Sequence, residues 1–213
     1  MATAALGCSV VALAVLGLAV NGGALESLDH ALLAAAQLPS GAALDWLMWA
    51  ISSLGRIEVT VLAVLALALS NRSEGRFRPG WWVPLAAFVA ATLVELGAKT
   101  LVHQPGPPST LRRGPRLYAA GLETAFSFPS GHMTRLTLLL GIALARLRGR
   151  VSGTGAWAVL AVVVAVVGYS RVYLGEHWPT DVLGGILLGG AGIAGSLLLS
   201  PPVPFEPEDA ARR

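Results

Sequence analysis

Apolar segments long enough to cross a membrane recur along this chain and constrain its fold more than any other feature. A helix needs about 20 residues to span the hydrocarbon core of a bilayer, and several runs of Ala, Leu, Val and Gly reach that length. Charged residues make up only 13% of the 213-residue sequence, about half the share that soluble domains carry. The sequence therefore predicts an all-α protein embedded in a membrane.

We expect a six-transmembrane-helix bundle, because six apolar segments are separated by stretches rich in glycine, proline, serine or charge. The expected spans are Ala2–Val20, Ile57–Ser70, Trp81–Val102, Ser130–Leu147, Trp157–Leu174 and Thr180–Leu199. Two short interfacial helices, Leu25–Leu38 and Ala42–Leu54, are expected between spans one and two. In the first of them, Glu26, Asp29 and His30 would form the polar side that faces away from the membrane.

Loop charge predicts the orientation of these spans in the cell membrane. Arginines cluster after the second and fourth expected spans, as Arg72, Arg76 and Arg78 in one loop and Arg146, Arg148 and Arg150 in the other. The positive-inside rule places both loops in the cytoplasm. The net charge is only +3 and the arginines lie in short clusters between apolar segments, which argues against a nucleic-acid partner. Residues 1–200 would form a single membrane domain, and residues 201–213 a short cytoplasmic tail.

One loop departs from the charge rule, because residues 104–128 are expected outside and yet include Arg112, Arg113 and Arg116. Two interpretations stay open: a short outer loop that happens to be basic, or attraction of an anionic substrate. Unusual polar residues are expected at the same outer ends of the spans, namely Lys99, Ser130, His132, Arg171, His177 and Asp181. Such residues are costly in apolar surroundings, so their clustering indicates a functional site.

His177 and Asp181 are four residues apart, and they share one face if they lie on a helix. A carboxylate there can hydrogen-bond one imidazole nitrogen and fix the tautomer, which leaves the other nitrogen free to attack an electrophile or bind a metal. Pro179 between them suits the first turn of a helix. The alternative is an interfacial histidine beside an aspartate that merely begins a helix.

The tetrapeptide Pro129–His132 precedes the fourth expected span and is suited to binding an anion. Gly131 lets the backbone approach a ligand closely, and a helix start offers free N–H groups. Ser130 adds a hydroxyl donor, and His132 in the first turn could donate a proton to a leaving oxygen. The alternative is a serine-capped helix with an incidental histidine.

Further charged residues lie on the third and fourth expected spans. Glu95, Lys99 and His103 are spaced four apart, which predicts a polar stripe that faces the interior of the bundle, with Glu95 pairing with Lys99. Arg135 lies one turn inside the fourth span, where Glu95, Asp181 or a bound phosphate would each serve as its anionic partner.

Two histidines, a carboxylate partner, several cations and a helix start together suit phosphoryl transfer. The cations neutralise the phosphoryl oxygens, one histidine attacks phosphorus, and the other protonates the leaving group. The sequence lacks the acidic clusters expected for Mg²⁺ and the His/Cys spacing expected for Zn²⁺. We therefore expect a reaction that needs neither a metal nor a cofactor.

These motifs resemble those of the type 2 phosphatidic acid phosphatase (PAP2) superfamily, and the resemblance runs from about residue 40 to residue 200. The family pattern has three parts: Lys-x6-Arg-Pro, Pro-Ser-Gly-His and Ser-Arg-x5-His-x3-Asp. The second part is present as Pro129–His132, and the third as Ser170, Arg171, His177 and Asp181 at the family spacing. The resemblance implies the same six-span fold and a membrane phosphatase.

The first part of the pattern is incomplete. Lys99 is followed after six residues by Gly106 and Pro107, so the family arginine is missing. Its loss either abolishes activity or is compensated by another arginine. We expect compensation, because every other position of the pattern is kept. Arg135 is the first candidate, and an arginine of the 112–116 loop is the second.

The resemblance also implies a role for each matching residue. His177 would be the nucleophile that forms a phosphohistidine, Asp181 would orient it, and His132 would protonate the leaving oxygen and later activate water. The phosphate would be bound by Lys99, Ser130, the Gly131 N–H and Arg171, with Arg135 as the expected replacement for the missing arginine.

The function implied by this resemblance is hydrolysis of a lipid phosphate at the outer leaflet. The substrate would carry a phosphate or diphosphate headgroup, as in a polyprenyl (di)phosphate or a phosphoglycerolipid phosphate. Two alternatives stay open: a phosphotransferase that passes the phosphate to another acceptor, and a degenerate family member that binds or moves lipid without hydrolysis.

Overall fold

The computed structural model describes residues 1–70, 72–73, 76–114, 125–146 and 153–200, and it is almost entirely helical. The eight α-helices of this part are α1 (Ala2–Asn21), α2 (Glu26–Ala36), α3 (Ala42–Ser52), α4 (Ile57–Leu69), α5 (Val83–Leu101), α6 (Gly131–Arg146), α7 (Gly153–Tyr173) and α8 (Pro179–Leu199). Short elements complete it: the 3-10 turns η1 (Ser53–Gly55) and η2 (Ser109–Leu111), and the antiparallel strands β1 (Arg72–Ser73) and β2 (Arg76–Phe77). The all-α expectation is confirmed.

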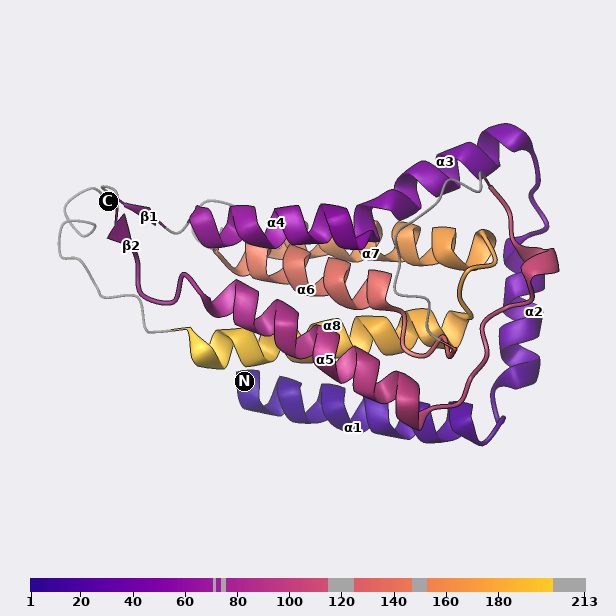
Figure 1. Cartoon of the computed structure of the whole chain (residues 1–213), viewed down its shortest axis with the longest axis horizontal. Helices are drawn as coiled ribbons and strands as arrows, with labels where there is room; N and C mark the ends of the chain where they lie inside the picture. Colours follow the sequence, from indigo (N-terminus) through magenta and orange to yellow (C-terminus); the bar gives the residue numbers. More distant parts are fainter. Residues whose placement is uncertain (71, 74–75, 115–124, 147–152, 201–213) are drawn as a thin grey trace.

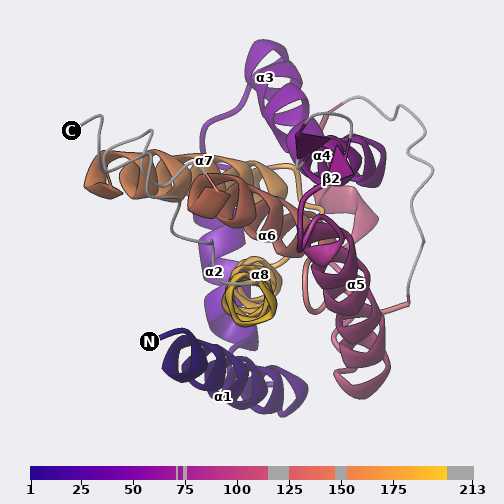
Figure 2. The ribbon, with the colours of Figure 1, turned by 90° about the vertical axis from the view of Figure 1, so that its left-hand side faces the viewer.

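The long helices run side by side, and α2 crosses one end of the bundle (Figure 1). Seen end-on, α8 lies in the middle of the other helices (Figure 2), and it contacts α1, α2, α5, α6 and α7. Its glycines allow α6 to approach closely. A Cβ on Gly185 would lie 2.5 Å from the Ser130 carbonyl oxygen, and one on Gly189 would lie 2.7 Å from Thr137 Cβ. The first turns of α6 and α8 are therefore held together.

The core fixes α6 from two sides. Val64 of α4 and Phe88 of α5 pack with Leu138 in one buried cluster. Met133 packs with Val167 of α7 in another. Buried side chains on both faces leave α6 little freedom to shift or rotate, so the residues at its start keep a fixed place.

Four helices of the described part, α1, α5, α7 and α8, are long and apolar enough to cross a membrane, which supports a multi-pass membrane protein. The pair α3–η1 and α4 passes the same test when taken together, with a bend of 42°. The bend falls at Arg56, between the expected interfacial helix Ala42–Leu54 and the expected span Ile57–Ser70. Six spans are therefore not confirmed, because this part of the chain contains four or five candidates. The separate interfacial helix at 42–54 stays a prediction.

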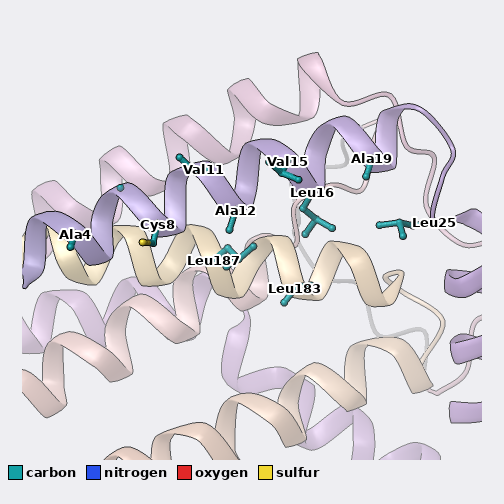
Figure 3. Close-up of a pocket in the computed structure, with 11 residues that line it drawn as sticks. Ala4, Cys8, Val11, Ala12, Val15, Leu16, Ala19, Leu25, Leu183 and Leu187 are labelled. Atoms are coloured by element: carbon teal, nitrogen blue, oxygen red, sulfur yellow. The ribbon is translucent and has the colours of Figure 1, made fainter.

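α1 packs against α8 and leaves an apolar groove of about 960 Å³ between them (Figure 3). Cys8, Val15 and Leu16 line it on the α1 side, and Leu183 and Leu187 on the α8 side. This lining suits a hydrocarbon chain better than a polar ligand.

Candidate active site

The sequence motifs meet at the end of the bundle that α2 crosses (Figure 1). Lys99 lies near the end of α5 and Arg171 near the end of α7, whereas Ser130 lies at the start of α6. His177 and Asp181 flank the start of α8. The Ser130 backbone N–H donates to the Asp181 carbonyl oxygen at 2.9 Å, so the second and third parts of the motif are joined directly. The expected convergence of the span ends is therefore seen.

The His177 ring is held by Asp181. His177 Nδ1 lies 3.2 Å from Asp181 Oδ2, and the same oxygen accepts the Trp178 backbone N–H at 3.0 Å. Asp181 is fully buried, so its charge is little screened by water. This contact favours the tautomer with hydrogen on Nδ1 and leaves Nε2 with a free lone pair. The spacing of the two residues thus gave the correct partner.

Two local features determine the setting of His177. Gly175 turns the chain between α7 and α8 with a φ of +66°, and a Cβ there would collide with the Leu111 carbonyl oxygen. Burial lowers the pKa of the His177 imidazole. The hydrogen bond with Asp181 opposes this shift, and the positive charge of Arg171 adds to it. Burial and the charge of Arg171 therefore both favour the neutral form of this imidazole.

His132 lies on the first turn of α6, where η1 packs against it. A Cβ on Gly55 would come within 3.0 Å of His132 Cβ, so only glycine fits there without displacing the ring. Arg171 and His177 both lie close enough to His132 to act on it electrostatically. The structure thus brings both histidines and one motif arginine into a single site.

Hydrogen-bond donors surround this site. Ser130 Oγ and Arg171 Nε are buried, and neither has a hydrogen-bond partner among the described residues. Arg171 Nη1 donates to Ser52 Oγ at 2.7 Å and forms an ion pair with Glu176. Lys99 Nζ donates to the carbonyl oxygens of Phe126 and Ser127, at 3.2 and 3.1 Å. Buried donors with spare capacity favour an anionic ligand.

Two expectations for the charged residues of α5 are wrong. Glu95 is paired with Arg135, whose Nη1 lies 3.0 Å from Glu95 Oε2, and Lys99 instead binds the two backbone carbonyls. His103 is exposed and lies beyond the end of α5, because the helix stops at Leu101. The polar stripe therefore consists of Glu95 and Lys99 only.

The Glu95–Arg135 pair lies directly beneath the start of α6. A Cβ on Gly131 would collide with the Glu95 carboxylate. Because Nη1 of Arg135 is engaged by this buried carboxylate, the structure shows Arg135 in a helix-to-helix contact. Its expected role as a phosphate ligand stays a prediction.

Gly106, which stands where the family pattern has arginine, has free space around it. Gly106 is exposed, and a Cβ there would meet only Ser127 Cβ, at an ordinary 3.7 Å. Arg112 is exposed and lies close enough to Arg171 to act on it electrostatically. Arg113 donates to the Pro39 carbonyl oxygen at 3.3 Å and lies over the ring of Tyr173. Arg116 lies outside the described residues. Of the described arginines Arg112 and Arg113, Arg112 is the one that acts electrostatically on Arg171.

Sequence reasoning missed Asp29. It was expected on the polar face of a surface helix, but its side chain is buried and accepts hydrogen bonds from Thr180 and Gln104. Burial raises the pKa of the Asp29 carboxyl, and the hydrogen bonds from Thr180 and Gln104 oppose that shift. Asp29 and Thr180 are 151 residues apart, and no local pattern could have linked them.

No group of three or more His, Cys, Asp or Glu side chains with the geometry of a metal site occurs in the described part of the chain. Arg171, Lys99 and Asp181 act electrostatically on His177, and Arg171, Arg135 and Arg56 act on His132. Lysine and arginine neutralise phosphoryl oxygens directly. The arrangement is therefore chemically suited to phosphoryl transfer.

The chain belongs to the PAP2 superfamily, whose sequence model matches residues 75–202. The fold is similar to that of the transmembrane PAP2-type phosphatidylglycerolphosphate phosphatase from Bacillus subtilis. The two structures superpose with a TM-score of 0.74 over 91% of this chain and 93% of that one, at 24% identity.

Two curated relatives show the same similarity in sequence. An undecaprenyl-diphosphatase of Sulfolobus acidocaldarius is 30% identical over 153 residues, which cover 70% of this chain and 66% of the relative. A decaprenylphosphoryl-5-phosphoribose phosphatase of Mycobacterium tuberculosis is 35% identical over 132 residues, which cover 61% of this chain and 64% of the relative. The chain thus spans slightly less than two thirds of each of these proteins.

Proposed function

We propose that this protein is a lipid phosphatase that hydrolyses a phosphate or diphosphate headgroup through a phosphohistidine on His177. The observation that carries the proposal is the contact between His177 Nδ1 and Asp181 Oδ2, beside the buried donors of Ser130 and Arg171. A neutral imidazole with a fixed tautomer is a competent nucleophile. Membership of the PAP2 superfamily supports the same reading.

In the first chemical step, His177 Nε2 attacks phosphorus in line with the leaving oxygen. The bond between phosphorus and the leaving oxygen breaks, and His132 donates the proton that this oxygen needs. In the second step His132 takes a proton from water, the water oxygen attacks the phosphohistidine, and inorganic phosphate leaves. Asp181 keeps its hydrogen bond to Nδ1 throughout and stabilises the positive charge on the ring.

The phosphoryl group is bound by two cations and two neutral donors. The cations are Lys99 and Arg171, and the neutral donors are the Ser130 hydroxyl and the Gly131 N–H. The substrate displaces Glu176 from Arg171 as it enters. Arg112 or Arg135 replaces the missing family arginine. The exposure of Arg112 near Arg171 favours Arg112, because Arg135 is already neutralised by Glu95.

The proposed substrate is a lipid whose tail stays in the bilayer while its headgroup enters the site. Two relatives are named for polyprenyl-linked phosphates and a structural neighbour for a phosphoglycerolipid phosphate, so both classes are candidates. The arginine clusters of the expected cytoplasmic loops favour the extracytoplasmic side of the cell membrane for the site. The end of α6, which is Arg146, and the strand β2, which precedes Arg78, lie at the end of the bundle opposite the start of α8 (Figure 1), and this is consistent with that orientation.

Phosphate release from a panel of lipids tests this function. The purified protein in detergent is offered polyprenyl monophosphates and diphosphates and a phosphoglycerolipid phosphate. Wild-type protein should release phosphate from at least one, and His177→Ala should abolish release while the protein stays folded. The exposed His103 provides the matched control, since His103→Ala should keep activity. Phosphate release by His177→Ala at the wild-type rate would remove His177 as the nucleophile.

A further inference from the structure

Asp29 on α2 accepts three hydrogen bonds, and two of them come from Thr180, in the turn that carries the proposed nucleophile. Its Oδ1 accepts the Thr180 backbone N–H at 3.0 Å. Its Oδ2 accepts the Thr180 hydroxyl at 2.6 Å and the Gln104 side-chain amide at 3.0 Å. The side chain is only 1% exposed, so all three bonds form out of contact with water and are strong for their type.

The start of α8 is capped only in part by its own residues, because Asp181 accepts the Trp178 N–H but the N-cap side chain accepts no helix N–H. The residue at the N-cap position is Trp178, whose side chain has no acceptor oxygen, and Pro179 has no N–H. The next N–H, that of Thr180, is one of the groups that have no acceptor within the helix. A carboxylate from another helix supplies that acceptor and places negative charge at the positive end of the helix dipole.

The same turn is held at a second point. Trp178 Nε1 donates to the Pro105 carbonyl oxygen at 2.8 Å, and the Trp178 ring packs against the His30 ring with centroids 4.6 Å apart. Two consecutive residues of α2, Asp29 and His30, thus contact the two residues that flank Pro179. His177 and Asp181 lie immediately outside this restrained pair.

We infer that Asp29 is a positioning residue: by capping α8 from another helix it holds His177 and Asp181 in the geometry for in-line attack. The inference rests on the proposed phosphohistidine mechanism. It adds the requirement for a carboxylate on α2, outside the family motifs. Loss of the cap frees the first turn of α8, and a displacement of about 1 Å at a nucleophile can cost about 100-fold in rate. The phosphate-binding side chains come from other helix ends, so substrate binding is retained.

The experiment measures single-turnover phosphorylation after a rapid alkaline quench, which preserves phosphohistidine, together with kcat and KM per folded protein. Asp29→Ala should slow phosphorylation and kcat by about 10- to 100-fold, while KM changes less than about twofold. The final stoichiometry of phosphoenzyme should match wild type. Asp29→Asn keeps an acceptor for the Thr180 N–H and should recover part of the rate.

Control variants distinguish a positioning role of Asp29 from an effect on folding and from a failure of the phosphohistidine mechanism. Glu26→Gln removes the same charge from an exposed site on α2 and should leave all constants unchanged. If Asp29→Ala does not fold, the milder variants Asp29→Asn and Thr180→Val provide the test. Phosphorylation at the wild-type rate in both variants would overturn the inference. A loss confined to stoichiometry would also overturn it, since that indicates fewer folded sites. Absence of phosphoenzyme in wild type would instead reject the phosphohistidine mechanism. In that case the kcat values of the Asp29 variants would test whether Asp29 positions the site.

Discussion

Arg135 Nη1 lies 3.0 Å from Glu95 Oε2, and both side chains are buried between α5 and α6. This pair lies under the Ser130–Gly131 turn that is proposed to bind phosphate. A buried ion pair that loses one partner leaves an uncompensated charge, whereas replacement of both partners by apolar residues is often tolerated. The pair can therefore be tested as a unit.

Arg135→Met should lower the free energy of unfolding by about 3–5 kcal/mol, because it leaves the Glu95 carboxylate buried without its partner. The double variant Glu95→Leu/Arg135→Met should recover most of this loss. Thermal unfolding in detergent and kcat/KM per folded protein provide the measurements. Arg146→Met, at the exposed end of the same helix, is the control and should change little. A tenfold rise in KM that persists in the double variant would instead identify Arg135 as a phosphate ligand.

The pH dependence of Asp181→Asn follows from the setting of His177. The hydrogen bond that His177 donates to Asp181 raises the pKa of His177 against the lowering effect of burial, so its removal should lower that pKa further. Since the nucleophile must be neutral, the acidic limb of the kcat/KM profile should move to lower pH. The rate itself should fall by about 10⁴-fold, because asparagine favours the wrong tautomer. A limb that moved to higher pH would contradict the assignment.

Gly106→Arg restores the arginine of the family pattern. The open space at Gly106 should accept the side chain without loss of stability. One charge-assisted hydrogen bond worth about 1.5 kcal/mol should raise kcat/KM by about tenfold. Gly106→Gln, which has a long side chain without the charge, is the control. Equal activity of the two variants would show that residue 106 does not reach the phosphate.

Glu176 forms an ion pair with Arg171, so in the proposed mechanism it competes with the substrate for that side chain. Its side chain is 34% exposed, against 7% for Arg171, so it can leave the guanidinium for water at modest cost. Glu176→Gln should lower KM, and the inhibition constant for inorganic phosphate, by up to about fivefold, because a partly exposed ion pair is worth about 1 kcal/mol. Steady-state kinetics with added phosphate provide the measurement. An unchanged or higher KM would mean that Glu176 helps to bind substrate.

Activity should survive metal chelation. The proposed mechanism neutralises the phosphoryl oxygens with lysine and arginine side chains and forms its nucleophile from an imidazole. Phosphate release should therefore be the same after dialysis against EDTA as before. A loss on chelation that a divalent cation restores would reject the metal-free mechanism.

The sequence predicted the parts of the site that depend on local spacing. The four-residue interval between His177 and Asp181 identified a real contact, because a helical turn brings such residues together. The positions of span ends predicted that Lys99, Ser130 and Arg171 gather at one end of the bundle. Both inferences use geometry that is contained within a single helix or in the order of helices.

The sequence predicted partners between helices only as alternatives: Glu95 was one of three candidate partners for Arg135, and it was also expected to pair with Lys99. Periodicity showed that Glu95 is on an inward face, but which cation it meets depends on the rotation of α6 against α5. Asp29 looked like a solvated residue because its helix is amphipathic, and its acceptor role appears only when α2 lies across α8. The number of spans is also undecided by hydropathy, because the bend at Arg56 divides one apolar stretch into two helices.

The contact between α2 and α8 has a consequence for engineering and for evolution within this fold. A chimera that exchanges only the segments carrying the three family motifs would import a nucleophile without the side chain that caps its helix. Residue 29 lies outside every motif, so substitutions there would pass unnoticed in a motif search. Functional transplants between relatives should therefore exchange residues 26–36 together with residues 177–199.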